Sequence, residues 1–340
     1  MQGSPHIAIA ILNYNGRKHL EHYLPSVVQT NYPNYSIWVI DNASTDDSIA
    51  FVQANYPQIN ITKNPVNGGF AEGYNMGLAH IDAPYVLLLN SDVAVDPCFL
   101  QPLVDTLESH PEMAMVQPKI LADLQRTQFE YAGAGGGAMD ALGYPFCRGR
   151  LFDTAEADAG QYNSEASIFW ASGAAVLVRK KIYDELGGLY AYFFMHNEEI
   201  DLCWRALNKG YTIGYNGQSV VYHLGGGSLA KESPRKTYFN FRNNLVMVCR
   251  NMPLSRLIFV LPMRAGLDGV AFLQMLATGK LENATSIPKA WFSFLKWMVT
   301  PSAQKWPGNR KAFNGPGRFN GSIVWQYFVR GKKSTADFFE

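Results

Sequence analysis

Three carboxylates stand within four consecutive positions near the middle of the sequence. Glu198, Glu199 and Asp201 follow the apolar run Phe193–Met195 and begin a predicted helix. Negative charges at a helix start can simply offset the helix dipole, which is common and worth ~0.3–1 kcal/mol for each charge. Apolar surroundings and like-charged neighbours would instead raise the pKa of a carboxyl group toward the range that suits a general base. The residues alone leave both interpretations open.

Asp92 and His223 are candidate ligands for a metal ion. Asp92 ends an Asn-Ser-Asp triplet after the apolar run Tyr85–Leu89, and His223 ends a later predicted strand. Mg²⁺ and Mn²⁺ are commonly held by one or two carboxylates together with substrate phosphates, and a mixed Asp/His pair suits Mn²⁺ better than Ca²⁺. The structural alternatives are a turn-capping aspartate and a hydrogen-bonded histidine. The glycines at 225–227 would let the backbone approach a phosphate closely.

Polar residues also follow two earlier predicted strands. Asn13 comes directly after His6–Leu12, and Asp41 comes directly after Tyr35–Ile40, where it could accept hydrogen bonds from a base or a ribose. The Asn-Gly-Gly turn at 67–69 opens a helix whose N-terminus can help to hold a phosphate or a sugar. This turn is not a GxGxxG fingerprint, so dinucleotide binding has poor support.

The elements that must position these residues alternate between strands and helices. The predicted strands are His6–Leu12, Tyr35–Ile40, Asn60–Lys63, Tyr85–Leu89, Ala114–Ile120, Ala174–Val178, Tyr211–Tyr215 and Ser219–Tyr222. The predicted helices between them are Arg17–Gln29, Asp46–Ala54, Ala71–His80, Lys180–Leu186 and Glu199–Lys209. This order predicts an α/β fold with a doubly wound, mostly parallel sheet flanked by helices. Because ligands bind at the carboxyl ends of such strands, we expect Asn13, Asp41 and Asp92 to converge on one crevice.

Two segments depart from this alternation. Gln125–Ser167 is rich in Gly, Ala and Asp with little periodicity, which predicts a long loop or mobile insertion over the site. After Lys231 the pattern becomes helical, and the predicted helices are Tyr238–Cys249, Ala265–Thr278 and Pro288–Val299. We therefore predict an α/β domain over residues 1–250 and a helical, basic C-terminal region over residues 251–340.

The charges are divided unevenly along the chain. Residues 1–226 hold 12 Lys and Arg against 23 Asp and Glu, whereas residues 227–340 hold 17 against 5. A basic tail suits an anionic partner such as nucleic acid, anionic lipid or a pyrophosphate-linked acceptor; the alternative is attraction between the two halves. Within the tail, Pro288–Val299 sets Trp and Lys beside an apolar face, as in an interfacial helix. Packing on the α/β domain or burial in a homodimer would explain the same pattern.

The sequence also bears on the compartment. The 4 cysteines form no CxxC pair, and no secretory signal is recognisable, so reduced thiols in a cytoplasmic protein are the simpler interpretation. The longest late apolar run, Leu257–Met263, stops at Arg264. With no uncharged apolar window of ~18 residues or more, we predict no transmembrane helix.

Seven segments, in order, are IAILNYNG, VIDNASTDDS, NPVNGGFAEGYNMGL, LLLNSDV, FWASGAAVLVRKKIYDELGGL, FFMHNEEIDLCWRALNKGY and VVYHLGGGS. Together they resemble the inverting family 2 glycosyltransferases of the GT-A fold, particularly their rhamnosyltransferase-like branch. The resemblance covers about residues 6–250, and seven pieces in the family's order are highly specific.

The resemblance implies roles for individual residues. Asp92 is similar to the last Asp of the family's DxD element, which holds Mg²⁺ or Mn²⁺ on the donor diphosphate, and His223 is similar to a late metal-ligand histidine. Glu198 and Glu199 resemble the family's Glu-Asp pair, whose second member usually serves as base. Glu199 is one methylene longer than that Asp, which leaves open whether it, Glu198 or Asp201 reaches the acceptor. The implied donor-binding residues are Asn13, Asn15, Asp41, Asn67, Gly69, Ser91 and Asp92.

The implied reaction is a single displacement that inverts the anomeric carbon of a nucleotide-diphosphate sugar. The branch favours dTDP-rhamnose as donor, with UDP- and GDP-sugars left open. The basic, Trp-rich tail suggests a lipid-linked or cell-surface glycan precursor as acceptor rather than nucleic acid. The enzyme would be cytoplasmic, peripheral on the inner face of a bacterial membrane. A sugar-phosphate nucleotidyltransferase is a rival, although residues 13–18 lack the Gly- and Arg-rich loop expected for it. A non-catalytic nucleotide-sugar-binding subunit is the other, and the retained carboxylates and the Asp92/His223 pair speak against it.

Overall fold

The computed structural model describes residues 3–130, 133–225, 233–301, 310 and 314–338. The strands of its main sheet are β1 (Ile7–Asn13), β2 (Tyr35–Asp41), β3 (Asn60–Lys63), β4 (Tyr85–Asn90), β5 (Val93–Val95), β6 (Met113–Ala122), β7 (Gln125–Phe129), β12 (Ala166–Ile168), β13 (Ala175–Arg179) and β14 (Thr212–His223). The helices that flank the sheet are α1 (Arg17–Val28), α2 (Ser48–Asn55), α3 (Gly69–Leu78), α4 (Leu100–Ser109), α5 (Lys180–Glu185) and α6 (Glu198–Lys209).

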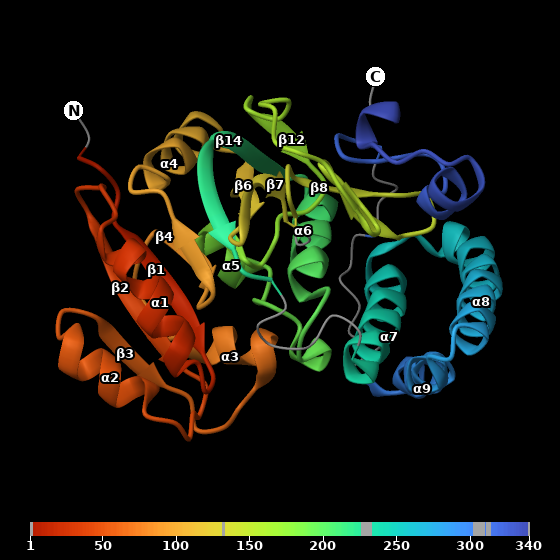
Figure 1. Cartoon of the computed structure of the whole chain (residues 1–340), viewed down its shortest axis with the longest axis horizontal. Helices are drawn as coiled ribbons and strands as arrows, with labels where there is room; N and C mark the ends of the chain where they lie inside the picture. The colour runs from red at the N-terminus through yellow and green to blue at the C-terminus, as the bar shows by residue number, and fades with distance from the viewer. Residues whose placement is uncertain (1–2, 131–132, 226–232, 302–309, 311–313, 339–340) are drawn as a thin grey trace.

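The main sheet confirms the predicted α/β fold and shows that it is mixed. Its strand order is β12-β14-β6-β13-β4-β1-β2-β3, with β5 on β14 and β7 on β6 (Figure 1). Strands β4, β1, β2 and β3 are parallel, whereas β13 runs antiparallel to both β4 and β6. The two late strands predicted separately form one strand, β14, with a register shift between Asn216 and Val220. Nearly all side chains of the central strands β1 and β4 are buried, which explains their unbroken apolar runs.

The prediction of a loop over Gln125–Ser167 is wrong for the described part of that segment. Strand β7 pairs with β6, and β12 pairs with β14. Between them lies a second sheet of β8 (Gly137–Met139), β9 (Pro145–Cys147), β10 (Arg150–Leu151) and β11 (Thr154–Ala155). These strands are too short to produce a visible alternation of polar and apolar residues. Gly143 and Gly149, with φ of +79° and +85°, supply the left-handed backbone at the turns.

The C-terminal region contains α7 (Pro234–Asn251), α8 (Leu254–Ala277) and α9 (Leu281–Met298), which lie together at the right of Figure 1. These bounds confirm the predicted helices, each of which is longer than predicted. The segment 314–338 returns to the small sheet, where the Phe319 amide donates to the Met139 carbonyl at 2.9 Å. The boundary at residue 250 stays a prediction, because α7 crosses it and packs on both α6 and α9.

Helix α8 bears on the prediction of no transmembrane helix. The helix continues past the apolar run Leu257–Met263 through Arg264 and Asp268, which are 1% and 2% exposed within its 24 residues. By length and composition alone α8 is apolar enough to cross a membrane, with 22% of its apolar window buried. The prediction of no transmembrane helix stays a prediction, because length and composition alone do not show that α8 spans a membrane.

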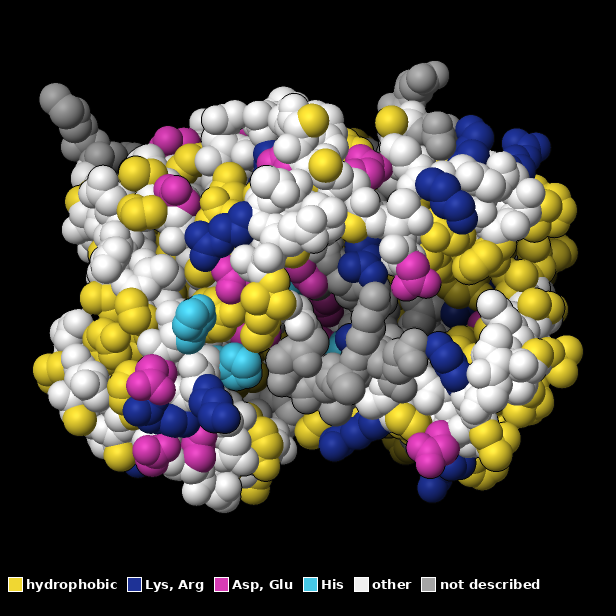
Figure 2. All heavy atoms as spheres, viewed as in Figure 1, with side chains coloured by type: hydrophobic (Ala, Val, Ile, Leu, Met, Phe, Trp, Pro, Cys, Tyr) yellow, Lys and Arg dark blue, Asp and Glu magenta, His cyan; other side chains and the backbone are white. Residues whose placement is uncertain are grey.

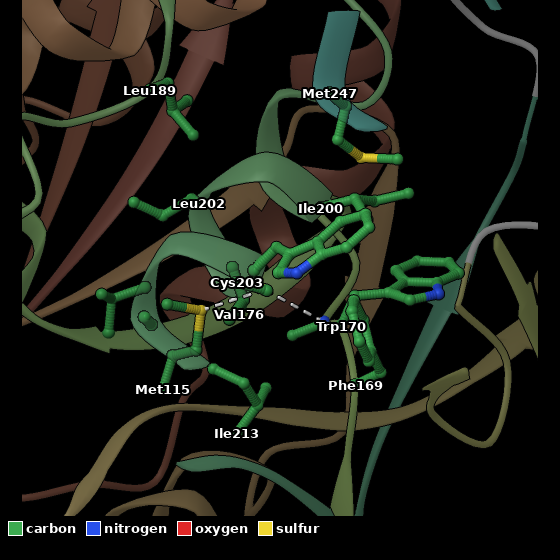
Figure 3. Packing of buried hydrophobic residues seen from close by; sticks show 14 of the residues in the cluster. Met115, Phe169, Trp170, Val176, Leu189, Ile200, Leu202, Cys203, Ile213 and Met247 are labelled. Carbon is green, nitrogen blue, oxygen red and sulfur yellow. Dashed lines mark hydrogen bonds between the residues drawn. The ribbon is translucent and has the colours of Figure 1, made fainter. Parts of the chain in front are cut away.

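Helix α6 is fixed against the sheet by its buried side. The Cys203 thiol accepts a hydrogen bond from the Ala171 amide at 3.3 Å and lies 3.4 Å from the Met115 sulfur (Figure 3). Met247 of α7 belongs to the same hydrophobic cluster. This packing holds the first turn of α6, which carries Glu198 and Glu199, between the sheet and α7.

Candidate active site

A pocket of about 670 Å³ lies where the ends of β4 and β14 face the first turn of α6. Asp92, His223, Glu198 and Glu199 line it, together with residues of α7. Figure 2 shows acidic side chains deep in a hollow near the centre of the molecule. The volume is within the range of small-molecule sites. The structure therefore brings the predicted metal ligands and two of the three predicted catalytic carboxylates into one cavity.

The backbone before α6 is strained. Phe194, His196 and Asn197 have φ of +63°, +69° and +71°, a region that residues other than glycine rarely occupy. Such conformations cost about 1–3 kcal/mol each and persist only where surrounding structure enforces them. Gly69 leaves room for this loop, because a Cβ on it would clash with the Phe194 carbonyl oxygen. The predicted turn 67–69 thus packs against the loop that positions the carboxylates of Glu198 and Glu199.

Asn243 of α7 holds the same loop from the other side. Its amide nitrogen lies 2.9, 2.7 and 2.8 Å from the carbonyl oxygens of Phe193, Met195 and His196. The neighbouring Arg242 donates to the carbonyls of Tyr192 and Phe193 at 2.9 and 3.1 Å. Two adjacent side chains of α7 therefore organise the backbone from which Glu198 and Glu199 project.

Glu198 and Glu199 have the electrostatics of reactive carboxyls. The Oε2 atom of each is buried and finds no hydrogen-bond partner within the described residues. Burial raises the pKa of Glu199 to about 7. Burial and the charge of Glu199 raise the pKa of Glu198 well above its usual range. Near neutral pH, Glu199 can therefore exchange a proton, whereas Glu198 is harder to ionise than an ordinary glutamate.

Asp201 does not share this environment, and the structure argues against its predicted catalytic role. Its carboxylate is fully buried and accepts hydrogen bonds from Arg205 at 2.7 Å, Arg250 at 3.2 Å and Asn251 at 2.7 Å. Burial opposes its ionisation, but the two guanidinium groups hold the pKa of Asp201 below its usual range. In the described lining of the pocket, Glu198, Glu199 and Ile200 are present and Asp201 is not. The Asp201 side chain lies on another face of α6, where it pairs with Arg205 of the same helix and with Arg250 of α7 and so links the two helices.

Asp92 and His223 lie together at the opposite wall. The Nε2 atom of His223 is 3.2 Å from an Asp92 oxygen, and its Nδ1 atom is 3.2 Å from an oxygen of Glu130. Burial alone would lower the pKa of His223, but the two carboxylates raise it to about 10. Asp92 is itself buried, and His223 more than offsets that burial to lower the pKa of Asp92.

The residues present fit a small divalent cation that completes its coordination with substrate. Two ligands at right angles on Mg²⁺ or Mn²⁺ stand ~3 Å apart, close to the observed separation of Asp92 and His223. A carboxylate on the second ring nitrogen, as Glu130 provides, is the usual support of a metal-bound histidine. Among the described residues, no group of three or more His, Cys, Asp or Glu is arranged for a metal. Donor phosphates would have to supply the remaining ligands.

Most of the predicted donor-binding residues form a separate network at the ends of β1 and β2. Asn13 lies opposite Asp41 in the sheet, and its amide nitrogen donates to Ser44 and Ser48 at 3.1 and 2.9 Å. The oxygen of Asn15 accepts from the Thr45 amide at 2.7 Å. These contacts shape the loop between β2 and α2, and Asp41 accepts from the Ser44 amide of that loop at 3.1 Å.

The turn at 67–69 is joined to this network through Asn42. The oxygen of Asn67 accepts hydrogen bonds from Asn42 at 3.0 Å and from the Gly69 amide at 2.9 Å. Ser91 lies between the two regions, since a Cβ on Gly16 would stand 3.7 Å from its hydroxyl oxygen. Of Asn13, Asp41 and Asp92, only Asp92 lies within the described lining of the pocket, so the predicted convergence is correct for the strand ends but not for the cavity.

Sequence reasoning missed several residues of the site. Glu130 lies in the segment interpreted as a loop, and Asn42 and Asn243 are polar residues whose function depends on contacts distant in sequence. His196 also lines the pocket, and burial together with the charge of Lys236 lowers its pKa to about 4. No local pattern marked these residues, since Asn42 follows Asp41 and Asn243 stands between Arg242 and Asn244. Of the predicted phosphate-binding glycines, Gly225 lines the pocket, and 226–227 lie outside the described residues.

Comparisons with known proteins place the chain near glycosyltransferases in sequence. Residues 8–136 match the family model described as glycosyl transferase family 2. The chain is similar to the N-acetylglucosaminyl-diphospho-decaprenol L-rhamnosyltransferase of Mycobacterium tuberculosis, with 25% identity over 231 residues, which cover 64% of this chain and 75% of the relative.

Solved structures share the fold. One is GalNAc-T7 with UDP, GalNAc and Mn²⁺, at a TM-score of 0.57 and 14% identity, covering 75% of this chain and 49% of that one. Another is the mannosyltransferase PcManGT from Pyrobaculum calidifontis with GDP-Man and Mn²⁺, at a TM-score of 0.55 and 14% identity, covering 88% and 89% of the two chains.

Proposed function

Because the chain belongs to the family 2 glycosyltransferases, we propose that it transfers a sugar from a nucleotide-diphosphate donor to an acceptor hydroxyl in one displacement, with inversion at the anomeric carbon. The observation that carries this proposal is the pair of buried carboxyls, Glu198 and Glu199, in one pocket with Asp92 and His223. One wall offers a base, and the other offers a place for the donor diphosphate.

Glu199 is the base in this mechanism. It takes the proton of the acceptor hydroxyl as that oxygen attacks the anomeric carbon, and the bond to the nucleotide diphosphate breaks on the opposite face. A pKa of about 7 leaves a large fraction of Glu199 ionised at neutral pH while keeping it basic enough to accept a proton. Burial and the charge of Glu199 raise the pKa of Glu198 well above its usual range, and in its protonated form Glu198 can donate a hydrogen bond to a sugar oxygen.

Asp92 and His223 would hold Mg²⁺ or Mn²⁺, with Glu130 orienting the imidazole from behind. When bound, such an ion neutralises charge on the departing diphosphate. Burial of both protein ligands keeps the polar groups of this wall away from water, so that they act strongly on the donor. The fold neighbours with Mn²⁺ support a divalent ion of this kind.

The network at the ends of β1 and β2 is the proposed nucleotide side of the site. Asn13 and Asn15 hold the loop after β2, while Asp41 is available to ribose or base beside it. The turn at Asn67 and Gly69, with Ser91, would connect this side to the diphosphate. These residues bind and orient the donor, and none of them needs to move a proton.

The proposed donor is dTDP-rhamnose, and the proposed acceptor is a lipid-linked glycan precursor on the cytoplasmic side of a membrane. Similarity to a rhamnosyltransferase whose name specifies a diphospho-decaprenol acceptor supports both choices. Other nucleotide sugars remain within the same chemistry, because a few side chains around the base and the sugar select among them.

Donor hydrolysis would test the proposal. A panel of nucleotide sugars is incubated with the protein and Mn²⁺ or Mg²⁺, with and without EDTA, and released nucleotide diphosphate is measured. We expect metal-dependent release from one donor, with dTDP-rhamnose first. An Asp92→Asn variant serves as control and should lose most of that release. Calorimetric binding of a donor without release or transfer, in the presence of glycan acceptors, would contradict the proposal and identify a sugar-nucleotide binder.

A further inference from the structure

Helix α8 has the reverse of the polarity expected for a helix on a water-exposed surface. Two of its three charged residues, Arg264 and Asp268, are 1% and 2% exposed, whereas Ile258, Phe259 and Leu273 are 67%, 68% and 63% exposed. A surface helix normally buries its apolar stripe and turns its charges to water. Figure 2 shows the result as a band of hydrophobic side chains at the right-hand edge of the molecule, where α8 lies.

The inward charges fix this orientation. Arg264 donates to Asn244 of α7 and stacks at 3.8 Å over the ring of Tyr144. Asp268 accepts hydrogen bonds from Tyr144 at 3.2 Å and from the Trp291 indole of α9 at 2.9 Å. Rotating the helix to bury its aliphatic side would leave these groups unpaired, at a large cost. The exposed apolar side of α8 therefore needs an apolar partner from outside the described part of the fold.

Helix α9 continues the same face. Leu281, Phe292, Leu295 and Val299 are 62%, 71%, 54% and 79% exposed. Between the two helices lies a groove of about 450 Å³. Its lining is Ala265, Asp268, Gly269, Phe272, Ile287, Pro288, Trp291, Phe292 and Leu295. We call α8, α9 and this groove the α8–α9 face. Contiguous apolar surface of this kind marks a protein or membrane interaction site.

The charges around the α8–α9 face are mostly positive. Lys280, Lys289 and Lys296 are exposed, against the single exposed acidic residue Glu282 of these two helices. A second copy of the chain would bring like charges together, because a two-fold interface pairs a surface with itself. An anionic lipid surface accepts the apolar residues and the lysines together, and each Lys near such a surface contributes ~1 kcal/mol.

We propose that the α8–α9 face docks the protein on an anionic bilayer leaflet, with a lipid hydrocarbon chain in the groove between the helices. The helices lie along the membrane surface, since Arg264 and Asp268 anchor α8 to the rest of the fold. Arg264 of α8 and Tyr144 beneath it also line the active-site pocket, so this wall of the pocket lies about one helix diameter from the leaflet. Docking requires neither the proposed donor nor turnover, so a failure of the docking proposal can be distinguished from a failure of the proposed reaction.

Vesicle sedimentation with the full-length protein tests this inference. Phosphatidylcholine vesicles with and without phosphatidylglycerol are compared for the wild type, for Phe259→Asp with Phe292→Asp, and for Leu124→Asp as matched control. Leu124 is 85% exposed on the turn between β6 and β7, away from the α8–α9 face. A second pair is Lys289→Glu with Lys296→Glu, with Lys181→Glu on α5 as its control.

We expect the wild type to sediment with anionic vesicles, and the double Phe variant to lose affinity by about tenfold or more. The double Lys variant should lose about tenfold or more on anionic vesicles and change little on neutral ones. Both controls should bind as the wild type does. Wild-type protein that stays in solution, or a double Phe variant that binds unchanged, would overturn the proposal. A wild-type dimer that the double Phe substitution splits, without vesicle binding, would assign the face to a second copy instead.

Discussion

The two sides of the site differ in how their polar groups are satisfied. At the ends of β1 and β2, Asn15, Asn42 and Asn67 each take part in hydrogen bonds of 2.7–3.2 Å. The buried side-chain oxygen of Asn13, which has no partner among the described residues, is an exception on this side. At the start of α6, Glu198 and Glu199 each keep a buried oxygen without a partner among the described residues, and both have raised pKa values. The first side is built to hold a shape, and the second is built to react.

This difference assigns donor binding to the polar side chains of one side of the site and the transfer chemistry to those of the other. An unpaired buried carboxyl costs free energy that a purely structural role would not justify, so its retention favours a functional role. A network in which most polar groups are paired costs less and transmits its shape to a ligand. The comparison predicts that substitutions on the α6 side affect turnover, and that substitutions on the β1–β2 side affect donor affinity.

The largest effect is expected from Glu199→Gln. Removing the base should lower kcat by about 10²–10⁴-fold and leave donor affinity nearly unchanged. In the wild type, kcat/KM should rise with pH up to about 7 and then level off, because burial raises the pKa of Glu199 to about 7. Rate profiles across pH and donor calorimetry measure both quantities. An equal loss in kcat and donor affinity would remove Glu199 from the role of base.

Stability provides the control for this substitution. Between the unfolded pKa of 4.5 and the folded pKa of about 7, folded Glu199 keeps a proton that the unfolded chain has lost, so its stabilising contribution disappears as pH rises through this range. Glu199→Gln should therefore be more stable than the wild type at pH ~8 and similar at pH ~4.5.

The Asp201→Asn substitution should instead lower the free energy of unfolding by about 3 kcal/mol, because it leaves Arg205 and Arg250 partly unpaired.

The sequence predicted the sheet, the order of its elements and the pocket residues Asp92, Glu198, Glu199 and His223, because each of these is encoded locally. An apolar run ends, a carboxylate or imidazole follows, and parallel strands bring such ends to one edge. Asp201 could not be separated from its neighbours, because only the tertiary positions of Arg205 and Arg250 show that it is paired. The same holds for Glu130 and for the inward charges of α8, whose partners lie far away in sequence.

A smaller effect is expected from Asn243→Ala, which removes the clamp on the strained loop before α6 without touching a carboxyl. The loop should relax, so kcat should fall by about tenfold while KM for the donor changes little. A purely structural role would lower stability only. The distinguishing measurement is the pH profile, whose midpoint should move toward the ordinary glutamate pKa as Glu199 becomes more hydrated. Asn55→Ala, on the exposed end of α2, is the matched control. An unmoved midpoint with reduced stability would assign Asn243 to folding alone.

The smallest effect is expected from Asn15→Ala, on the satisfied side of the site. Asn15 has a φ of +50° and accepts hydrogen bonds from Thr45 and Asp46. Alanine would lose these hydrogen bonds and would adopt the left-handed backbone less readily than asparagine does. The free energy of unfolding should fall by about 1 kcal/mol, and KM for the donor should rise a few-fold with kcat nearly intact. Asn15→Asp keeps the accepting oxygen and should restore both values. If Asn15→Ala instead lowered kcat as strongly as Glu199→Gln, shape and chemistry would not be divided between the two sides, and the loop after β2 would take part in the transfer step itself.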